Sequence, residues 1–372
     1  MSKRLGISVY PEHFSEAECI NYIDKAKGFG FERIFMNLLE VGEESEAILS
    51  KFKRICTHAK NIGFEVILDV NPAVFKELKI ASTDIGFFKE IGATGIRLDE
   101  DFGGKVEAKI SNNKLDMKLE INASTFTNIM DRIIENKGNP SNIIACHNFY
   151  PQKYTGLSFE LFANASRKLH EQKCLVAAFV SSLNPNAQGP WPLKEGLPTI
   201  EMHRDVPLEW QARHFIATNL VDDIIISNQP AFDKELEALA QLHKNGINFK
   251  IDLDSSVTSL EREIIFDFKE SKDSLTGHKI RGDYSDYMIR STMPRVIYKN
   301  ESIMPRKYKN DTFERGDVVV LNDKYGRYKG ELHIVTKTLP NEGKKNFVGR
   351  LLDDDLIFLD YISPWKEFKF IK

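Results

Sequence analysis

The chain has 372 residues and a formal net charge of −3, with a pI of about 6.3. Because acidic and basic residues nearly balance, the sequence has no general attraction to nucleic acids or anionic membranes, and we expect neither as a partner. Hydrophobic residues make up 42% of the chain and charged residues 28%, as in ordinary globular proteins, and the length suits two domains.

The N-terminal segment MSKRLGISVYPEH enters a strand-like run at Leu5 without a long apolar signal segment. No uninterrupted apolar run is long enough to span a bilayer, so we expect a cytoplasmic protein. The four cysteines form no CxxC pair, and three of them lie in or beside apolar runs, where buried thiols are expected. This usage indicates a reducing compartment and no disulfide framework.

Short apolar, β-rich runs recur through the first two thirds of the chain. Most of them lack strict alternation of apolar and polar residues, as expected for strands covered on both faces. The runs span residues 5–9, 33–38, 65–70, 95–98, 118–121, 142–146, 174–180 and 222–227.

Segments with helical spacing lie between these runs. In residues 15–31, apolar side chains from Ala17 to Ala26 share one stripe, and Ser15 occupies an N-cap position. Similar segments, ending near a glycine, are residues 45–64, 125–138 and 232–246, and a short helix is expected near residues 106–110.

Eight strand–helix units over roughly 250 residues predict an α/β fold with a (β/α)8 TIM barrel. A doubly wound open sheet is the alternative. However, the first strand is followed by YPEHFSE instead of the GxGxxG of dinucleotide-binding folds. GxxxxGK[ST] does not occur either, which argues against a P-loop nucleotide site.

The pattern changes near residue 255. Residues 313–340 have the alternation of a hairpin-rich β segment, with glycine-containing turns at 316–317, 325–326 and 329–330. We therefore expect a TIM-barrel domain over residues 1–255 and a smaller, mostly-β domain over residues 256–372.

Active sites of TIM barrels lie at the C-terminal ends of the strands. Polar side chains follow most of the predicted strands, and the seventh strand leads into a long loop rich in glycine and proline, residues 181–205. The side chains expected at this rim are Tyr10, Glu12, Asn37, Glu40, Asp69, Asn71, Arg97, Asp99, Asp101, Glu120, Asn122, His147, Asn148, Tyr150, Asn228 and Gln229.

A rim of carboxylates, amides and aromatic residues suits a polyhydroxylated ligand. Hydrolysis of a glycosidic bond needs a proton donor and a second carboxylate. Asp99 and Glu120 belong to neighbouring predicted strands, which lie about 4.8 Å apart in a sheet, so the two can face one reacting centre.

Six segments, in order along nearly the whole chain, resemble a bacterial family associated with 6-phospho-N-acetylmuramidases. They are GIRLDEDF, LEINAST, ACHNFYPQKYTGLS, GPWPLKEGLPTIEMHRD, HKIRGDYSDYMIRST and RGDVVVLNDKYGRYKGELHIV. The resemblance implies an N-terminal TIM barrel and a C-terminal cyclophilin-like β domain.

The same resemblance implies a glycoside hydrolase of peptidoglycan recycling. Its substrate would be N-acetylmuramic acid 6-phosphate linked β-1,4 to N-acetylglucosamine, and these two sugars would be its products. Because such a disaccharide enters the cell as the phosphorylated product of a transporter, the resemblance also implies a cytoplasmic enzyme.

The family's motif positions indicate the site residues. We expect Asp99 and Glu120 to be catalytic, while Glu100 and Asp101 are weaker candidates because many relatives have an aromatic residue after the first Asp of DEDFGG. The substrate-binding residues expected from the motifs and the rim are Tyr10, Glu12, Asn37, Asn122, His147, Asn148, Tyr150, Glu201, Arg204, Arg281 and Arg290, and His203 is a further motif position.

Arg204, Arg281 and Arg290 are the candidates for the substrate's phosphate. For Arg281 the alternative is an ion pair with Asp283 inside the fold. Cys146-His147 without HxH or HExxH predicts no metal.

Other functions fit a barrel followed by a β domain. Pyridoxal-phosphate enzymes need a Schiff-base lysine, typically after the first strand, where this chain reads SVYPEH, so we expect no cofactor. A phosphosugar aldolase or isomerase is another enzyme alternative, and a non-catalytic sugar-phosphate-binding protein is the alternative outside enzymes.

Overall fold

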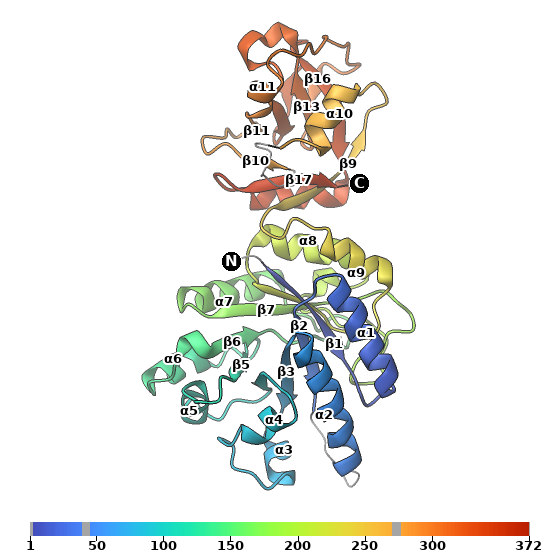
Figure 1. Cartoon of the computed structure of the whole chain (residues 1–372). Helices are drawn as coiled ribbons and strands as arrows, with labels where there is room; N and C mark the ends of the chain where they lie inside the picture. Colours follow the sequence, from blue (N-terminus) through green and yellow to red (C-terminus); the bar gives the residue numbers. More distant parts are fainter. Residues whose placement is uncertain (1–2, 39–44, 270–276, 372) are drawn as a thin grey trace. The chain divides into compact units, whose positions relative to one another are not determined.

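The computed structural model describes residues 3–38, 45–269 and 277–371. Within these ranges, eight strands form a closed barrel in which neighbours follow the order of the sequence (Figure 1). All neighbouring pairs are parallel, and the first strand closes the barrel against the eighth. The strands are β1 (Arg4–Val9), β2 (Arg33–Asn37), β3 (Glu65–Val70), β4 (Gly95–Leu98), β5 (Lys118–Asn122), β6 (Ile143–Cys146), β7 (Leu175–Val180) and β8 (Asp223–Ile226). The predicted α/β barrel is confirmed, and each strand lies on a predicted run.

Helices follow the strands and surround the barrel (Figure 1). They include α1 (Glu16–Gly28), α2 (Ser45–Asn61), α3 (Pro72–Glu77), α4 (Gly86–Glu90), α5 (Lys105–Ser111), α6 (Ile129–Glu135), α7 (Phe159–Glu171), α8 (Leu208–Thr218) and α9 (Asp233–Ala240). Ser15 caps α1 as predicted, because its hydroxyl accepts the Glu18 N–H while the Glu18 carboxylate accepts the Ser15 N–H.

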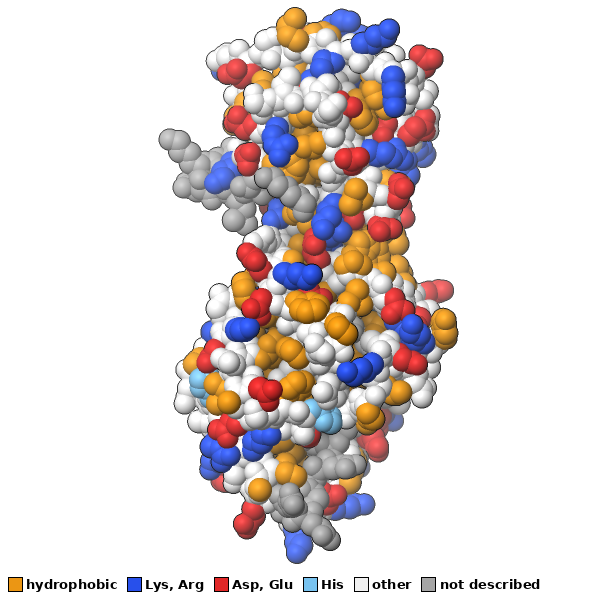
Figure 2. Space-filling model, turned by 90° about the vertical axis from the view of Figure 1, so that its right-hand side faces the viewer, with side chains coloured by type: hydrophobic (Ala, Val, Ile, Leu, Met, Phe, Trp, Pro, Cys, Tyr) orange, Lys and Arg blue, Asp and Glu red, His pale blue; other side chains and the backbone are white. Residues whose placement is uncertain are grey.

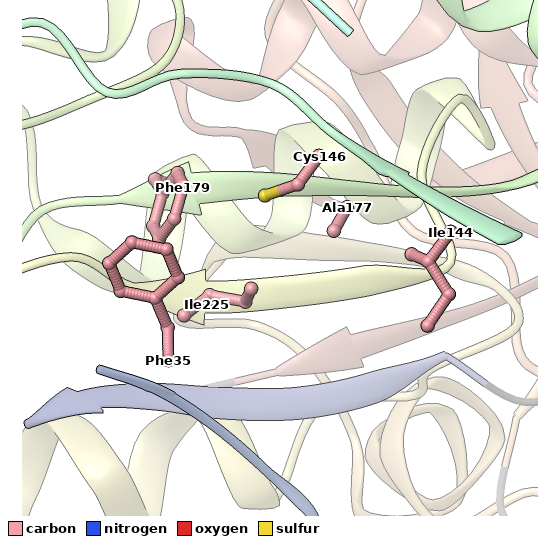
Figure 3. Packing of buried hydrophobic residues seen from close by; sticks show 6 residues of the cluster. All are labelled: Phe35, Ile144, Cys146, Ala177, Phe179 and Ile225. Atoms are coloured by element: carbon pink, nitrogen blue, oxygen red, sulfur yellow. The ribbon is translucent and has the colours of Figure 1, made fainter. Parts of the chain in front are cut away.

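Apolar side chains fill one side of the barrel interior (Figure 3). Phe35 on β2 and Phe179 on β7 meet edge to face, with ring centroids 5.1 Å apart. Since β2 and β7 are not neighbours in the barrel, this contact crosses the interior. Side chains two residues apart share a face of a strand, so Arg33 and Asn37 point inward together with Phe35. The interior therefore combines an apolar side with a polar one.

The chain divides into two compact units, residues 1–215 with 219–242, and residues 216–218 with 243–372. The described part of the second unit has a seven-stranded, mostly antiparallel sheet in the order β10-β17-β9-β16-β13-β14-β11, and a two-stranded one, β12-β15. Its elements are β9 (Ile247–Leu253), α10 (Ser259–Phe266), β10 (His278–Lys279), β11 (Met288–Ser291), α11 (Pro294–Ile297), β12 (Thr312–Phe313), β13 (Asp317–Leu321), β14 (Leu332–Val335), β15 (Leu339–Pro340), β16 (Lys345–Leu351) and β17 (Glu367–Ile371).

The predicted mostly-β character of the C-terminal region is confirmed. The expected boundary at residue 255 falls just after β9, a strand that pairs with β16 and β17 and belongs to the second unit.

The surface carries both signs of charge. On the face shown in Figure 2, Lys and Arg side chains are interspersed with Asp and Glu on both units. No helix within the described ranges is both long enough and apolar enough to cross a bilayer.

Candidate active site

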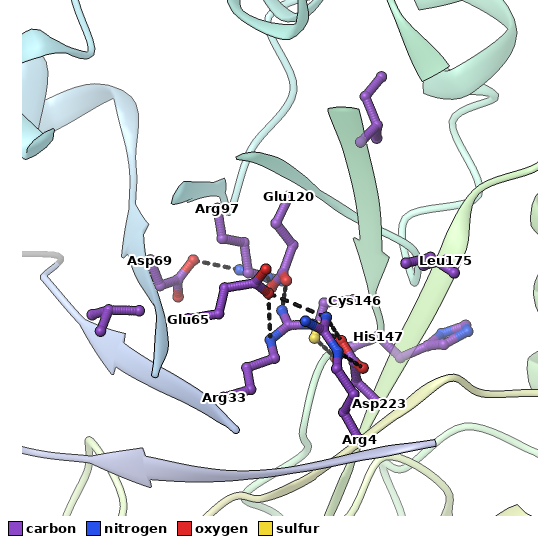
Figure 4. Close-up of polar contacts among 12 residues, drawn as sticks. Arg4, Arg33, Glu65, Asp69, Arg97, Glu120, Cys146, His147, Leu175 and Asp223 are labelled. Carbon is purple, nitrogen blue, oxygen red and sulfur yellow. Dashed lines mark hydrogen bonds and ion pairs between the residues drawn. The ribbon is translucent and has the colours of Figure 1, made fainter. Parts of the chain in front are cut away.

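A buried ionic cluster occupies the N-terminal end of the barrel interior. Arg33 is fully buried and its guanidinium forms ion pairs with Asp223 and Glu120 (Figure 4). Arg4 binds Asp223 with two hydrogen bonds of 2.7 Å and lies 3.2 Å from Glu65. Arg4, Arg33, Glu65 and Asp223 are each the first residue of their strands. In TIM barrels this end serves stability, so we assign the cluster to the fold.

A second polar group surrounds Arg97, the third residue of β4, at the C-terminal half of the barrel. Arg97 Nη1 donates to Asp69 Oδ1 at 2.6 Å and to Asp99 Oδ1 at 2.9 Å. Its Nη2 donates to Asn148 Oδ1, and its Nε lies 3.8 Å from Glu120 Oε1. Figure 4 shows Arg97 between Asp69 and Glu120. One arginine therefore gathers side chains from β3, β4, β5 and the segment after β6.

Asp69 and Asp99 meet at the C-terminal rim. Asp69 is the penultimate residue of β3, and Asp99 directly follows β4, where its N–H donates to the Val70 carbonyl. The two side chains differ in exposure, 7% for Asp69 and 38% for Asp99. Burial raises the pKa of the Asp69 carboxyl to about 6, and the Asp99 charge adds to this rise while Arg97 opposes it.

Glu120 lies deeper than Asp99. It is the central residue of β5, its side chain is fully buried, and it lies between Arg33 and Arg97. The two residues predicted to be catalytic thus contact the same arginine, but only Asp99 is open to solvent. The catalytic role of Glu120 stays a prediction.

Glu12 follows β1 and is open to solvent, yet its surroundings remove enough water to raise the pKa of its carboxyl to about 7. Neighbouring Tyr10 is fully buried, and its hydroxyl donates to the Ser227 carbonyl at 2.5 Å. Burial raises the pKa of this phenol. Asn37 is 5% exposed, and its Oδ1 has no hydrogen-bond partner within the described ranges. Glu40 lies outside the described residues.

The residues after β5 and β6 position Asp99 and Asn148. Asn122 Nδ2 donates to the Asp99 carbonyl at 3.1 Å. Ser124 Oγ accepts the Asn148 N–H at 2.9 Å and lies 3.2 Å from His147 Nδ1. His147 is fully buried, which lowers the pKa of its imidazole to about 3. We expect a neutral imidazole that orients Ser124.

Arg204 and Glu201 link the loop after β7 to the segment after β6. Arg204 donates to both carboxylate oxygens of Glu201, at 2.7 and 2.9 Å, and to three carbonyls, including Tyr150 O at 3.0 Å. Glu201 also accepts the N–H groups of Tyr154 and Gly156, and these bonds, led by that to Arg204, lower its pKa to about 2. The pair therefore organises both loops, while direct contact with substrate stays a prediction.

Two of the predicted phosphate ligands belong to the second unit. Arg281 Nε donates to Asp283 Oδ1 at 2.5 Å, and Arg290 Nη2 donates to the Asp283 carbonyl at 3.0 Å. The pairing with Asp283 is the alternative that the sequence left open for Arg281.

The rim has two features that the sequence did not single out. Trp191 in the loop after β7 is 45% exposed and meets Phe149 edge to face, with ring centroids 6.1 Å apart. The loop also encloses a cavity of about 200 Å³. Its polar lining residues are Ser181, Ser182, Asn184, Lys194, Arg204, Asp205 and Asn228. In the described ranges, no group of three or more His, Cys, Asp or Glu side chains is arranged to hold a metal ion.

Two family models match consecutive parts of the chain. The model of the N-terminal part of 6-phospho-N-acetylmuramidase matches residues 5–241, and that of the C-terminal part matches residues 247–371. No curated protein matches the sequence.

Two solved structures cover essentially the whole chain. An uncharacterized protein from B. cereus has 40% sequence identity and a TM-score of 0.87, with 100% of both chains covered. A conserved protein of unknown function from a locus in Enterococcus faecalis has 24% identity and a TM-score of 0.69, with 99% of this chain and 96% of that chain covered. Both similarities extend over the two units.

Proposed function

The chain belongs to the 6-phospho-N-acetylmuramidase family and is a glycoside hydrolase, and from this premise we propose its substrate and the residues that act on it. The substrate is N-acetylmuramic acid 6-phosphate linked β-1,4 to N-acetylglucosamine, and water cleaves the bond between the two sugars. The observation that supports this proposal is the group of acidic side chains around Arg97, at the rim where TIM barrels carry out their chemistry. Asp99, the most open of them, acts directly on the sugar.

Glu120, the second residue expected to be catalytic, acts in this proposal through Arg97. A buried carboxylate 3.8 Å from the guanidinium helps to hold that cation in place. Trp191 packs against Phe149, in the segment after β6, and is 45% exposed, so its ring can stack on the apolar face of a sugar ring.

The phosphate is recognised at the loops after β7 and β8. TIM barrels frequently bind phosphate at these loops. The cavity of about 200 Å³ is lined by Lys194 from the first loop and Asn228 from the second. Lys194 has an exposed ammonium group with only the Pro185 carbonyl, at 3.1 Å, as a partner within the described ranges, so it can bind an anion. The guanidinium of Arg204 is already engaged by five hydrogen bonds.

We place the enzyme in the cytoplasm, in peptidoglycan recycling. A substrate phosphorylated during uptake would be found there, since the phosphate marks a sugar that has already entered the cell. The products would be N-acetylmuramic acid 6-phosphate and free N-acetylglucosamine.

Incubation of the protein with the phosphorylated disaccharide tests the reaction. We expect release of N-acetylglucosamine, and we expect Asp99→Asn to lower kcat by at least about 100-fold, because an amide cannot replace the carboxylate. Absence of release by the wild-type protein would contradict the proposed substrate. Binding without turnover would instead indicate a sugar-phosphate-binding protein.

A further inference from the structure

We infer that Asp69 is the proton donor of this site and Asp99 its nucleophile, so that the glycosidic bond is cleaved with retention of configuration. This inference rests on the proposed function and concerns the roles of two carboxylates. The sequence placed Asp69 at the rim but did not distinguish it from the other polar residues there.

The expected retention of configuration rests on the distance between the carboxyl groups of Asp69 and Asp99. Both Oδ1 atoms accept a hydrogen bond from the same nitrogen, Arg97 Nη1, at 2.6 and 2.9 Å, so they cannot be more than 5.5 Å apart. Retaining glycosidases have carboxyl groups about 5–5.5 Å apart, whereas inverting enzymes separate them by about 6.5–9.5 Å to admit a water. The geometry at Arg97 therefore favours a covalent route.

Access to the rim distinguishes Asp69 from Glu120. Arg97 engages only Oδ1 of Asp69, and Oδ2 has no hydrogen-bond partner in the described part of the chain. The Asp69 side chain is 7% exposed, whereas both carboxylate oxygens of Glu120 are buried. Asp69 therefore lies nearer to the solvent at the rim than Glu120 does.

The charges inside the barrel favour a proton on Asp69. One buried cation, Arg97, lies within ion-pair distance of three acids, Asp69, Asp99 and Glu120. With all four groups ionised this set would carry an excess negative charge, which a site of low dielectric opposes.

The other groups around Asp69 act in the same direction. The ionisable groups that influence it most are Arg97 and Asp99, while Tyr10 and Cys146 feel its charge across the interior. Among these neighbours Arg97 is the only cation, and Asp99 shares it. The raised pKa of Asp69, about 6, agrees with this arrangement.

The reaction then has two steps, formation of a glycosyl ester on Asp99 and its hydrolysis. In the first, Asp69 gives its proton to the glycosidic oxygen, the bond from that oxygen to C1 breaks, and an oxygen of Asp99 bonds to C1. N-acetylglucosamine leaves as a neutral alcohol, and Asp69 becomes a carboxylate. In the second, Asp69 takes a proton from water, the water oxygen bonds to C1, and the ester to Asp99 breaks. N-acetylmuramic acid 6-phosphate leaves with its β configuration, and Asp69 is again protonated.

The test compares two leaving groups in Asp69→Asn. The natural disaccharide needs a proton on its leaving oxygen, whereas the 4-nitrophenyl β-glycoside of N-acetylmuramic acid 6-phosphate does not. We expect kcat/KM to fall by about 100-fold or more for the disaccharide, and by less than about 10-fold for the aryl glycoside. Asp99→Asn should lose both activities, and Glu120→Gln should lower both by the same factor.

Equal losses of both activities in an Asp69→Asn protein that melts at the wild-type temperature would overturn the assignment. So would a wild-type reaction whose first product in a proton NMR time course is the α-anomer. Wild-type kcat/KM should also fall as pH rises above about 6, because Asp69 then loses its proton, and Asp69→Asn should lack this fall. If Glu12→Gln removes the fall instead, Glu12 is the donor. Failure of the wild-type protein to cleave the disaccharide would count against the proposed function, a separate result.

Discussion

At the scale of single residues, depth inside the barrel decides which acid can act. Asp99 could be located from the sequence because it directly follows a short apolar run that had to be a strand. Glu120 and Asp69 could not be ranked in this way. Their exposure depends on which side chains cross the interior to meet them, and the partners of Glu120 come from β2 and β4. Such contacts between strands distant in the chain leave no local signal.

The ionic cluster at the other end of the barrel should affect stability and leave chemistry unchanged. Asp223 is 1% exposed and binds both Arg4 and Arg33, so Asp223→Asn takes one carboxylate partner from each of two cations. Loss of one partner from a buried ion pair costs about 3–5 kcal/mol. We expect a decrease of that order in the free energy of unfolding, measured with urea, and an unchanged kcat below the melting temperature.

Lys25→Met is a matched control, because the Lys25–Asp233 pair is mostly exposed, with side-chain exposures of 51% and 64%. It should change stability little. The N-terminal ionic cluster is assigned to stability and the C-terminal rim to chemistry. An Asp223→Asn protein as stable as the wild type, or one whose kcat falls as in Asp69→Asn, would contradict this assignment.

At the scale of elements, the strands could be predicted more completely than the helices. Most barrel strands are buried on both faces and therefore read as short, largely apolar runs without strict alternation. Helices α3 and α4 have only six and five residues, too few for a clear apolar stripe. The loop after β7 was recognised as long, but its attachment through Arg204 could not be foreseen, because that side chain bonds mainly to backbone carbonyls and Glu201.

This attachment predicts a pH dependence of the loop. The pKa of Glu201 is lowered to about 2, from an ordinary value near 4.3 in the unfolded chain. Because the pKa is lower in the folded state, the ionised carboxylate stabilises that state fully at pH values above about 4. This stabilisation is lost as pH falls from about 4 to about 2 and the carboxylate takes up a proton. We expect pepsin, a protease that is active in acid, to cut the 181–205 loop faster as pH falls through this window.

Trypsin should cut this loop faster in Glu201→Gln than in the wild type at pH 7, because an amide cannot match the charge-assisted bonds to Arg204. Glu195→Gln is the control, since Arg204 binds only the backbone carbonyl at that position and the amide oxygen of Gln can still accept the Lys153 N–H. Equal cleavage rates in wild type and Glu201→Gln would show that this ion pair does not hold the loop.

At the scale of the whole molecule, composition and the change of pattern along the chain indicated two units of different architecture. The boundary was harder to locate, because β9 comes soon after α9, the last helix of the barrel unit, and its alternating sequence INFKIDL does not show which strands it pairs with. Only its pairing with β16 and β17 assigns it to the second unit. Such pairing depends on residues about a hundred positions later in the chain, which a local pattern does not contain.

Two separate parts of the molecule offer cations for the substrate's phosphate, and one comparison distinguishes them. If the loops after β7 and β8 bind it, Lys194→Met should raise KM for the phosphorylated disaccharide about 10-fold or more, as expected from loss of a charged hydrogen bond. KM for the unphosphorylated disaccharide should stay unchanged in that variant. Arg281→Met, which removes a side chain already bound to Asp283, should then leave both KM values unchanged. The opposite result, with Arg281→Met raising KM only for the phosphorylated substrate, would assign phosphate recognition to Arg281, one of the candidates expected from the sequence. A loss of affinity for both substrates in Lys194→Met would mean that the lysine shapes the loop and does not bind phosphate.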